Sequence, residues 1–119
     1  MPNSKKILIV DDDPSIRKFL EANLTARGYA VSLAEGGPQA FQILAAEKAD
    51  LILLDIMMPE MDGFTVCQAI RKTAKTPIIM LSAREGEGDC EKCLACGAED
   101  YITKPFPLKE LLSKIKSLI

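Results

Sequence analysis

Short apolar runs separated by polar segments recur along the chain. The clearest runs are Ile7-Leu8-Ile9-Val10, Leu51-Ile52-Leu53-Leu54 and Ile78-Ile79-Met80-Leu81. Continuous apolar runs of this length are typical of strands that are buried on both faces of a sheet. Weaker patterns over residues 29–34 and around Tyr101-Ile102 predict two further strands, which brings the total to five.

Between these strands, apolar residues recur at the spacing of an amphipathic helix. Asp13 and Pro14 are residue types that suit the N-cap and the first position of a helix, and Gly28 suits its end. Four more helices are predicted: after Pro38, after Gly63, from Asp89 to Cys96, and after Pro105. Strands and helices therefore alternate along the whole chain.

This alternation predicts an α/β fold in which right-handed crossovers connect the strands of a parallel sheet and helices cover both faces. No linker, repeat or change of composition divides residues 1–119, so we expect one domain with a doubly wound (βα)5 architecture. The pattern alone does not determine the order of the strands. The flavodoxin-like order 2-1-3-4-5 is the common solution at this size, and it places a ligand crevice at the carboxyl ends of the first and third strands.

Composition narrows the functional classes. The formal charge is −2 and the sequence has no basic run, so binding of nucleic acid is not expected. No apolar stretch approaches the roughly 20 residues of a membrane span, and no signal peptide is recognisable, so we expect a cytoplasmic protein that does not bind membranes. The chain contains no histidine, which excludes imidazole catalysis and histidine-ligated metals within it. Its four cysteines are expected to be thiols.

Polar residues stand where the predicted strands end. Asp11, Asp12, Asp55, Ser82 and Lys104 should meet at one edge of the sheet, because the carboxyl ends of parallel strands share an edge. Adjacent carboxylates repel each other unless a cation lies between them, and oxygen ligands suit Mg2+. A hydroxyl and an ammonium group suit a tetrahedral oxyanion. The sequence therefore predicts a site for a metal ion and a phosphoryl group together.

Over essentially its whole length the sequence resembles the receiver domain of bacterial two-component response regulators, the CheY-like family. The matching motifs are residues 7–14 (ILIVDDDP), 53–59 (LLDIMMP) with 61–63 (MDG), 81–83 (LSA), 97–101 (GAEDY) and 104–106 (KPF).

The resemblance implies that Asp55 is phosphorylated by the phosphohistidine of a histidine kinase or a histidine phosphotransfer protein. Asp11, Asp12, Asp55 and the backbone carbonyl of Met57 would hold Mg2+, while Ser82 and Lys104 would bind the phosphoryl oxygens. The domain would be a signalling module that assists its own phosphorylation and dephosphorylation rather than an enzyme acting on a separate substrate.

The resemblance also implies a switch formed by Ser82 and Tyr101. This switch would change the surface of the fourth helix, fifth strand and fifth helix. An output protein, or an effector domain outside the 119 residues, would read that surface, which can also pair two copies in a homodimer.

Three other interpretations are weighed against this one. The run of Cys90, Cys93 and Cys96 could hold a metal or an iron-sulfur cluster, but the ferredoxin run needs a fourth cysteine where this chain has Asp100, and helical spacing favours packing. A phosphatase of the haloacid dehalogenase type needs an acid where Met57 stands. A flavin phosphate would be repelled by the aspartates after the first strand.

Overall fold

The computed structural model describes residues 5–58, 60–82, 95–104 and 106–119. Within them, one sheet of five parallel strands has the order β2-β1-β3-β4-β5, which confirms the predicted fold. The strands are β1 (Lys6–Val10), β2 (Ala30–Ala34), β3 (Leu51–Asp55), β4 (Ile78–Ser82) and β5 (Asp100–Thr103). The helices are α1 (Pro14–Thr25), α2 (Gly37–Ala46), α3 (Gly63–Arg71) and α5 (Leu108–Leu118). The helix predicted from Asp89 to Cys96 lies largely outside the described residues.

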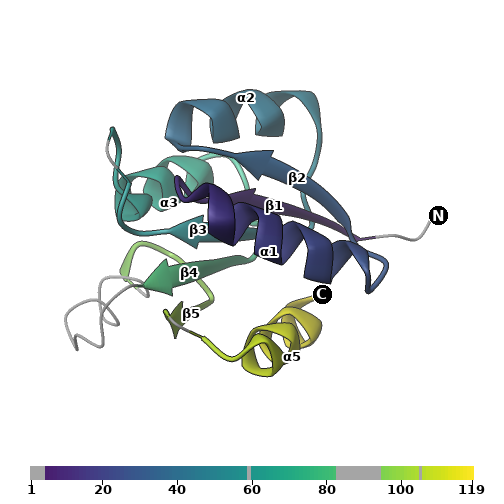
Figure 1. Ribbon diagram of the computed structural model, residues 1–119. Coiled ribbons are helices and arrows are strands. Elements are labelled where there is room, and N and C mark those ends of the chain that lie inside the picture. Colours follow the sequence, from purple (N-terminus) through teal and green to yellow (C-terminus); the bar gives the residue numbers. More distant parts are fainter. Residues whose placement is uncertain (1–4, 59, 83–94, 105) are drawn as a thin grey trace.

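Two hydrophobic cores lie on opposite faces of the sheet. Alternate residues of the central strands point to opposite sides, so Leu8 and Ile52 join α2 and α3, whereas Ile9 and Leu53 join α1 and α5. Figure 1 shows the corresponding layers, with α1 and α5 on one side of the sheet and α2 and α3 on the other. Burial on both faces explains why these strands are continuous apolar runs in the sequence.

The strand register brings the polar strand ends to one edge. Val10 pairs with Leu54, Asp55 with Leu81, and Ser82 with Thr103, so all these strands end at a similar level. The arrows in Figure 1 accordingly point toward the same side of the molecule. Backbone hydrogen bonds from Asp11 to Ala34 (3.1 Å) and from Ile56 to Leu81 (3.1 Å) continue the ladders beyond the strands. These bonds fix the backbone on which the polar side chains stand.

The start of α1 is as the sequence predicts. The carboxylate of Asp13 accepts a hydrogen bond from the Ser15 amide at 2.9 Å, and Pro14 is the first helical residue. The helix ends at Thr25, earlier than predicted, and Gly28 turns the chain with φ 91°.

In the part of the chain that the structure describes, no helix combines the length and apolar character that a membrane crossing requires.

Candidate functional site

Three carboxylates converge at the carboxyl ends of β1 and β3. Asp11 and Asp12 follow β1, Asp55 ends β3, and one oxygen atom from each lies within 4.8 Å of the others. Asp11 is fully buried and Asp55 is 3% exposed, whereas Asp12 is exposed. Buried carboxylates so close together need cations to offset their repulsion.

Lys104 supplies one such cation from the end of β5. Its Nζ atom lies 2.9 Å from Asp11 Oδ2 and 3.3 Å from Asp55 Oδ1, and its side chain is largely buried. Burial alone would lower the pKa of Lys104, but the hydrogen bond to Asp11 and the charges of both carboxylates raise it, and the net shift is upward. Lys104 therefore remains an ammonium group that ties β5 to β1 and β3.

The pKa of Asp55 is shifted in the opposite sense to that of an ordinary paired carboxylate. Burial, and then the charge of Asp11, raise it from 3.8 to about 7, although Lys104 and the Met57 amide lower it. The Met57 amide donates a 3.3 Å hydrogen bond to Asp55 Oδ1. The charged form of Asp55 is therefore unfavourable unless a cation compensates it. Buried carboxylates with raised pKa values are candidates for nucleophiles or metal ligands.

The other predicted residues lie at or near this edge. Ser82 is the last residue of β4 and is 1% exposed, and its carbonyl accepts a 2.5 Å hydrogen bond from the Lys104 amide. Met57 follows β3, with an exposed side chain. Tyr101 lies in β5, half-buried against the core on the α2 and α3 side. Tyr101 pairs with Met80 on β4. It precedes Ile102, so it lies one residue further from the carboxyl ends of the strands.

A glycine fixes the loop that follows Asp55. The Gly63 amide donates a 2.8 Å hydrogen bond to the Ile56 carbonyl, and Asp62 caps α3 through the Thr65 amide at 2.9 Å. A Cβ atom at Gly63 would lie 2.3 Å from the Asp55 carbonyl oxygen. Only glycine allows α3 to begin this close to the end of β3. The sequence marks Asp62-Gly63 as a turn, but it does not show this close approach.

Arg17 is a residue of the site region that no sequence motif indicates. Its Nη1 atom donates a 2.7 Å hydrogen bond to the Asp11 carbonyl, and its Nη2 atom lies 3.5 Å from Glu35 Oε1. The only signal in the sequence is its place one turn after the cap of α1, beside the apolar Ile16.

Near Glu35, a pocket of about 650 Å³ opens between the loops after β2 and β3 and is lined in part by Asp12, Glu35 and Met61.

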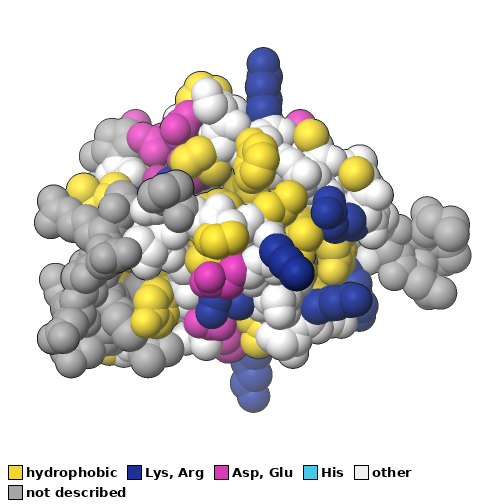
Figure 2. All heavy atoms as spheres, turned by 60° about the horizontal axis from the view of Figure 1, so that its bottom comes forward, with side chains coloured by type: hydrophobic (Ala, Val, Ile, Leu, Met, Phe, Trp, Pro, Cys, Tyr) yellow, Lys and Arg dark blue, Asp and Glu magenta, His cyan; other side chains and the backbone are white. Residues whose placement is uncertain are grey.

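The donor set fits a hard divalent cation. Three carboxylates from two adjacent strand ends provide oxygen ligands, and the exposure of Asp12 leaves room for water, which Mg2+ usually retains. In Figure 2, one group of acidic side chains lies toward the upper left and another near the middle of the face, whereas several Lys and Arg side chains lie toward the right. The three carboxylates at the strand ends favour the binding of a cation there.

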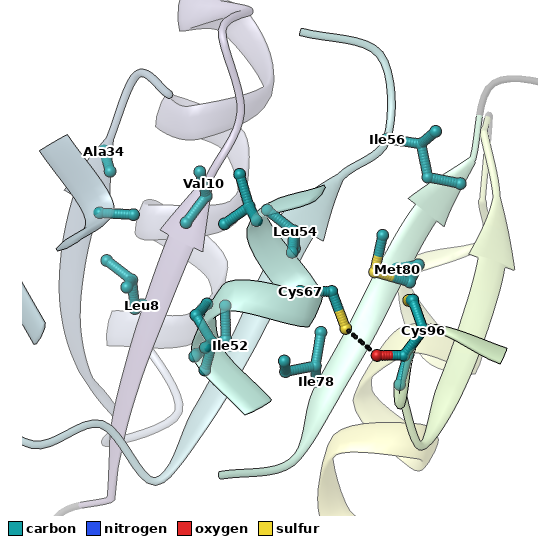
Figure 3. Close-up of a cluster of buried hydrophobic side chains, with 14 residues drawn as sticks. Leu8, Val10, Ala34, Ile52, Leu54, Ile56, Cys67, Ile78, Met80 and Cys96 are labelled. Atoms are coloured by element: carbon teal, nitrogen blue, oxygen red, sulfur yellow. Dashed lines mark hydrogen bonds between the residues drawn. The ribbon is translucent and has the colours of Figure 1, made fainter. Parts of the chain in front are cut away.

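Cys96 lies in the core on the α2 and α3 side. It is 6% exposed, and its carbonyl oxygen accepts a 3.4 Å hydrogen bond from the Cys67 thiol (Figure 3). Burial and the neighbouring Cys96 raise the pKa of Cys67 to about 12. Both are thiols rather than halves of a disulfide. Cys96 thus packs as a core residue, and Cys90 and Cys93 lie outside the described residues.

Comparisons with known proteins agree on one family. The family model described as response regulator receiver domain matches residues 7–116. A probable transcriptional regulator, ycf27, of Cyanophora paradoxa is 48% identical over 117 residues, which are 98% of this chain and 49% of that protein. The response regulator MprA of Mycolicibacterium vanbaalenii is 41% identical over 115 residues, which are 96% of this chain and 50% of that protein. This chain spans about half the length of these relatives.

Solved structures show the same fold. The chemotaxis protein CheY4 of Vibrio cholerae superposes with a TM-score of 0.92 at 32% identity, covering 98% of this chain and 99% of the other. Sequence motifs, strand order and the family match therefore agree. The chain belongs to the family of response regulator receiver domains, which take part in two-component signal transduction.

Proposed function

We propose that residues 1–119 form one receiver domain that accepts a phosphoryl group on Asp55 in a Mg2+-dependent reaction. The observation that carries this proposal is the contact of one buried ammonium group, Lys104, with Asp11 at 2.9 Å and Asp55 at 3.3 Å, beside three converging carboxylates. In a site that only bound a metal, a buried ammonium group against two of the ligands would weaken their attraction for the metal ion. A site that receives an anion on a carboxylate does need one.

The residues of the chain have separate roles in this reaction. An oxygen of Asp55 forms a bond to phosphorus while the bond from phosphorus to the donor's imidazole nitrogen breaks, and the leaving imidazole takes up a proton. Lys104 and the Ser82 hydroxyl bind the oxygens of the transferred group and offset their charge. Asp11, Asp12, Asp55 and the Met57 carbonyl would hold Mg2+, which neutralises charge on the phosphoryl oxygens when it is bound.

The phosphohistidine of the donor lies outside residues 1–119, because these residues contain no histidine. A histidine kinase or a histidine phosphotransfer protein would present its phosphohistidine at the strand ends. The relatives are about twice as long as this chain. The phosphorylated state of the domain would be read either by an effector domain or by a separate output protein. No direct binding of nucleic acid by this domain is proposed.

The output surface follows from the position of the switch residues. Ser82 and Tyr101 lie on the adjacent strands β4 and β5, which supports a switch in which the Ser82 hydroxyl moves toward the phosphoryl group and the Tyr101 ring turns inward. The surface that changes includes β5 and α5, and it is where we place contact with an output partner or a second copy of the domain. The domain is thus a switch that assists its own phosphorylation and dephosphorylation.

Incubation with acetyl phosphate, followed by intact mass measurement, tests the proposal. We expect an adduct of one phosphate in the presence of Mg2+, little adduct in EDTA, and no adduct in Asp55→Ala. Asp13→Asn is the matched control, because it also removes one acid near β1 but alters only the cap of α1. The adduct should persist in that variant.

Two results would contradict the proposed function. An adduct that survives in Asp55→Ala would show that another residue accepts the phosphoryl group. A wild-type protein that forms no adduct, although it binds Mg2+, would leave the carboxylates as a metal site without phosphoryl transfer.

A further inference from the structure

The guanidinium group of Arg17 donates to the backbone next to two of the three acids. The Arg17 side chain is 14% exposed, and its Nη1 atom lies 2.7 Å from the carbonyl oxygen of Asp11. The backbone of Arg17 belongs to α1 and bonds to the Asp13 carbonyl at 3.1 Å. One residue of α1 therefore reaches back to the end of β1, where the metal ligands begin.

The bond from Arg17 to the Asp11 carbonyl acts on the peptide unit that leads to Asp12. The peptide unit between Asp11 and Asp12 is planar, so a donor that fixes the Asp11 oxygen also fixes the plane from which the Asp12 side chain starts. Asp11 itself is held at its amide by Ala34, at 3.1 Å, and at Oδ1 by the Asp13 amide, at 2.9 Å. Asp12 is exposed, and repulsion from Asp11 and Asp55 favours its movement away from them.

The contact with Glu35 does not explain the burial of Arg17. Glu35 is 74% exposed and lies 3.5 Å from Arg17 Nη2, and such exposed pairs contribute little. The shorter bond is the one to the Asp11 carbonyl, which belongs to a fully buried residue. A partly buried arginine that donates to a backbone carbonyl is suited to fix geometry.

We propose that Arg17 is a positioning residue for Mg2+: through the Asp11 carbonyl it holds the Asp12 carboxylate in place for the cation. This inference rests on the proposed function of the carboxylate cluster. The charge of Arg17 by itself acts in the opposite direction, because a positive group near the site repels Mg2+. Positioning and charge therefore predict opposite changes in Mg2+ affinity when Arg17 is replaced.

Titration calorimetry with Mg2+ on the intact chain distinguishes the two effects. Arg17→Met keeps an unbranched side chain but removes the donors, and we expect it to weaken Mg2+ binding about tenfold, as the loss of groups that orient metal ligands commonly does. Arg17→Lys keeps one donor group and should recover part of the affinity. Lys18→Met is the matched control, since it removes the charge of the exposed neighbour on α1 and should change the affinity less than about twofold.

A double-mutant cycle identifies the residue through which Arg17 acts. In an Asp12→Asn background, Arg17→Met should have little further effect on Mg2+ affinity, because the carboxylate that it positions is already absent. A merely structural role would produce the same loss in both backgrounds. Circular dichroism spectra of each variant check that only folded proteins are compared.

Three outcomes overturn the inference. If Arg17→Met binds Mg2+ as tightly as the wild type, or more tightly, Arg17 does not position a ligand. If its effect is unchanged in Asp12→Asn, it does not act through Asp12. If the wild-type protein binds no Mg2+ at all, the proposed metal site itself fails, and the inference fails with it; binding by the wild type separates this case from the first two.

Discussion

At the scale of single residues, the burial of Asp55 dominates the electrostatics of the site. Its carboxyl group is raised to a pKa of about 7 by burial and by Asp11, even though Lys104 lies 3.3 Å away. One ammonium group shared between two buried carboxylates does not compensate both. The metal-free site therefore holds a charge that reduces the stability of the fold.

This imbalance predicts a dependence of stability on pH in the absence of metal. Because the folded-state pKa of Asp55 lies above its ordinary value of 3.8, its contribution to stability is greatest below pH 3.8 and is lost as the pH rises through about 7. Asp55→Asn removes the ionisable group while Asp11 still pairs with Lys104. We expect this variant to unfold with a free energy higher than the wild type by on the order of 2 kcal/mol at pH 8, and by far less at pH 4.

Urea unfolding in EDTA at the two pH values measures this difference. Equal stabilisation of Asp55→Asn at pH 4 and pH 8 would show that the effect comes from packing and that the charge of Asp55 has no part in it. Added Mg2+ should raise the stability of the wild type more than that of the variant, since the cation binds the folded carboxylate cluster and Asp55→Asn removes one of its three carboxylates.

At the scale of elements, the junction of β3 and α3 is set by one close approach of backbone. Gly63 lets α3 begin against the Asp55 carbonyl, and Asp62 caps the helix at that point. The loop between these elements carries the Met57 amide to Asp55 Oδ1. The position of α3 and the geometry of the site therefore depend on the same contact.

Gly63→Ala should damage both stability and function. Its Cβ atom would lie 2.3 Å from the Asp55 oxygen and 2.8 Å from the Ile56 Cα atom, which are backbone atoms that cannot rotate away. We expect a loss of about 3 kcal/mol in the free energy of unfolding, with slower phosphorylation in the fraction that folds. Gly36→Ala is the control, because its backbone is extended with φ −175° and nothing lies within 4 Å of an added Cβ. Equal effects of the two changes would refute this account of the junction.

At the scale of the whole molecule, Arg71 connects the end of α3 to the segments that precede β4 and β5. Its Nε atom donates to the Gly97 carbonyl at 2.8 Å, its Nη1 atom to the Thr76 carbonyl at 2.6 Å, and its Nη2 atom pairs with Glu99. The same Glu99 carboxylate accepts a 2.8 Å bond from the Ile78 amide. One side chain thus joins the segments that enter β4 and β5.

Arg71→Met should destabilise the fold without changing the metal site. The carbonyls of Gly97 and Thr76 would lose their charged donor, which predicts a loss of about 2 kcal/mol, measured by urea unfolding. Lys72→Met, on the exposed neighbour, should have a small effect. Mg2+ affinity should stay the same, because Arg71 is at the end of α3 opposite to Gly63. A variant as stable as the wild type would show that these bonds contribute nothing.

The sequence by itself determined the strands, the four helices that the structure describes and the residue types at the strand ends. The runs at 7–10, 51–54 and 78–81 predict strands correctly because a strand buried on both faces must be apolar throughout. Asp13 and Pro14 predict the start of α1 because a cap acts within a few residues. The apolar runs predict the ends of the strands less accurately. Strands β3 and β4 each extend one polar residue beyond the apolar run, to Asp55 and Ser82. The reason is that the ladder continues through backbone hydrogen bonds, which do not depend on side-chain polarity.

Only the tertiary structure decided how these residues meet. Lys104 bonds to Asp11 across 93 positions of sequence, and no local pattern specifies a contact at that separation. The packing of the helices against the sheet likewise decides three further features. They are the hydrogen bond from Arg17 to the Asp11 carbonyl, the close approach of Gly63 to Asp55 and the raised pKa of Asp55. Local patterns report burial and the ends of elements, whereas distances, orientations and electrostatic fields arise when the elements are packed together.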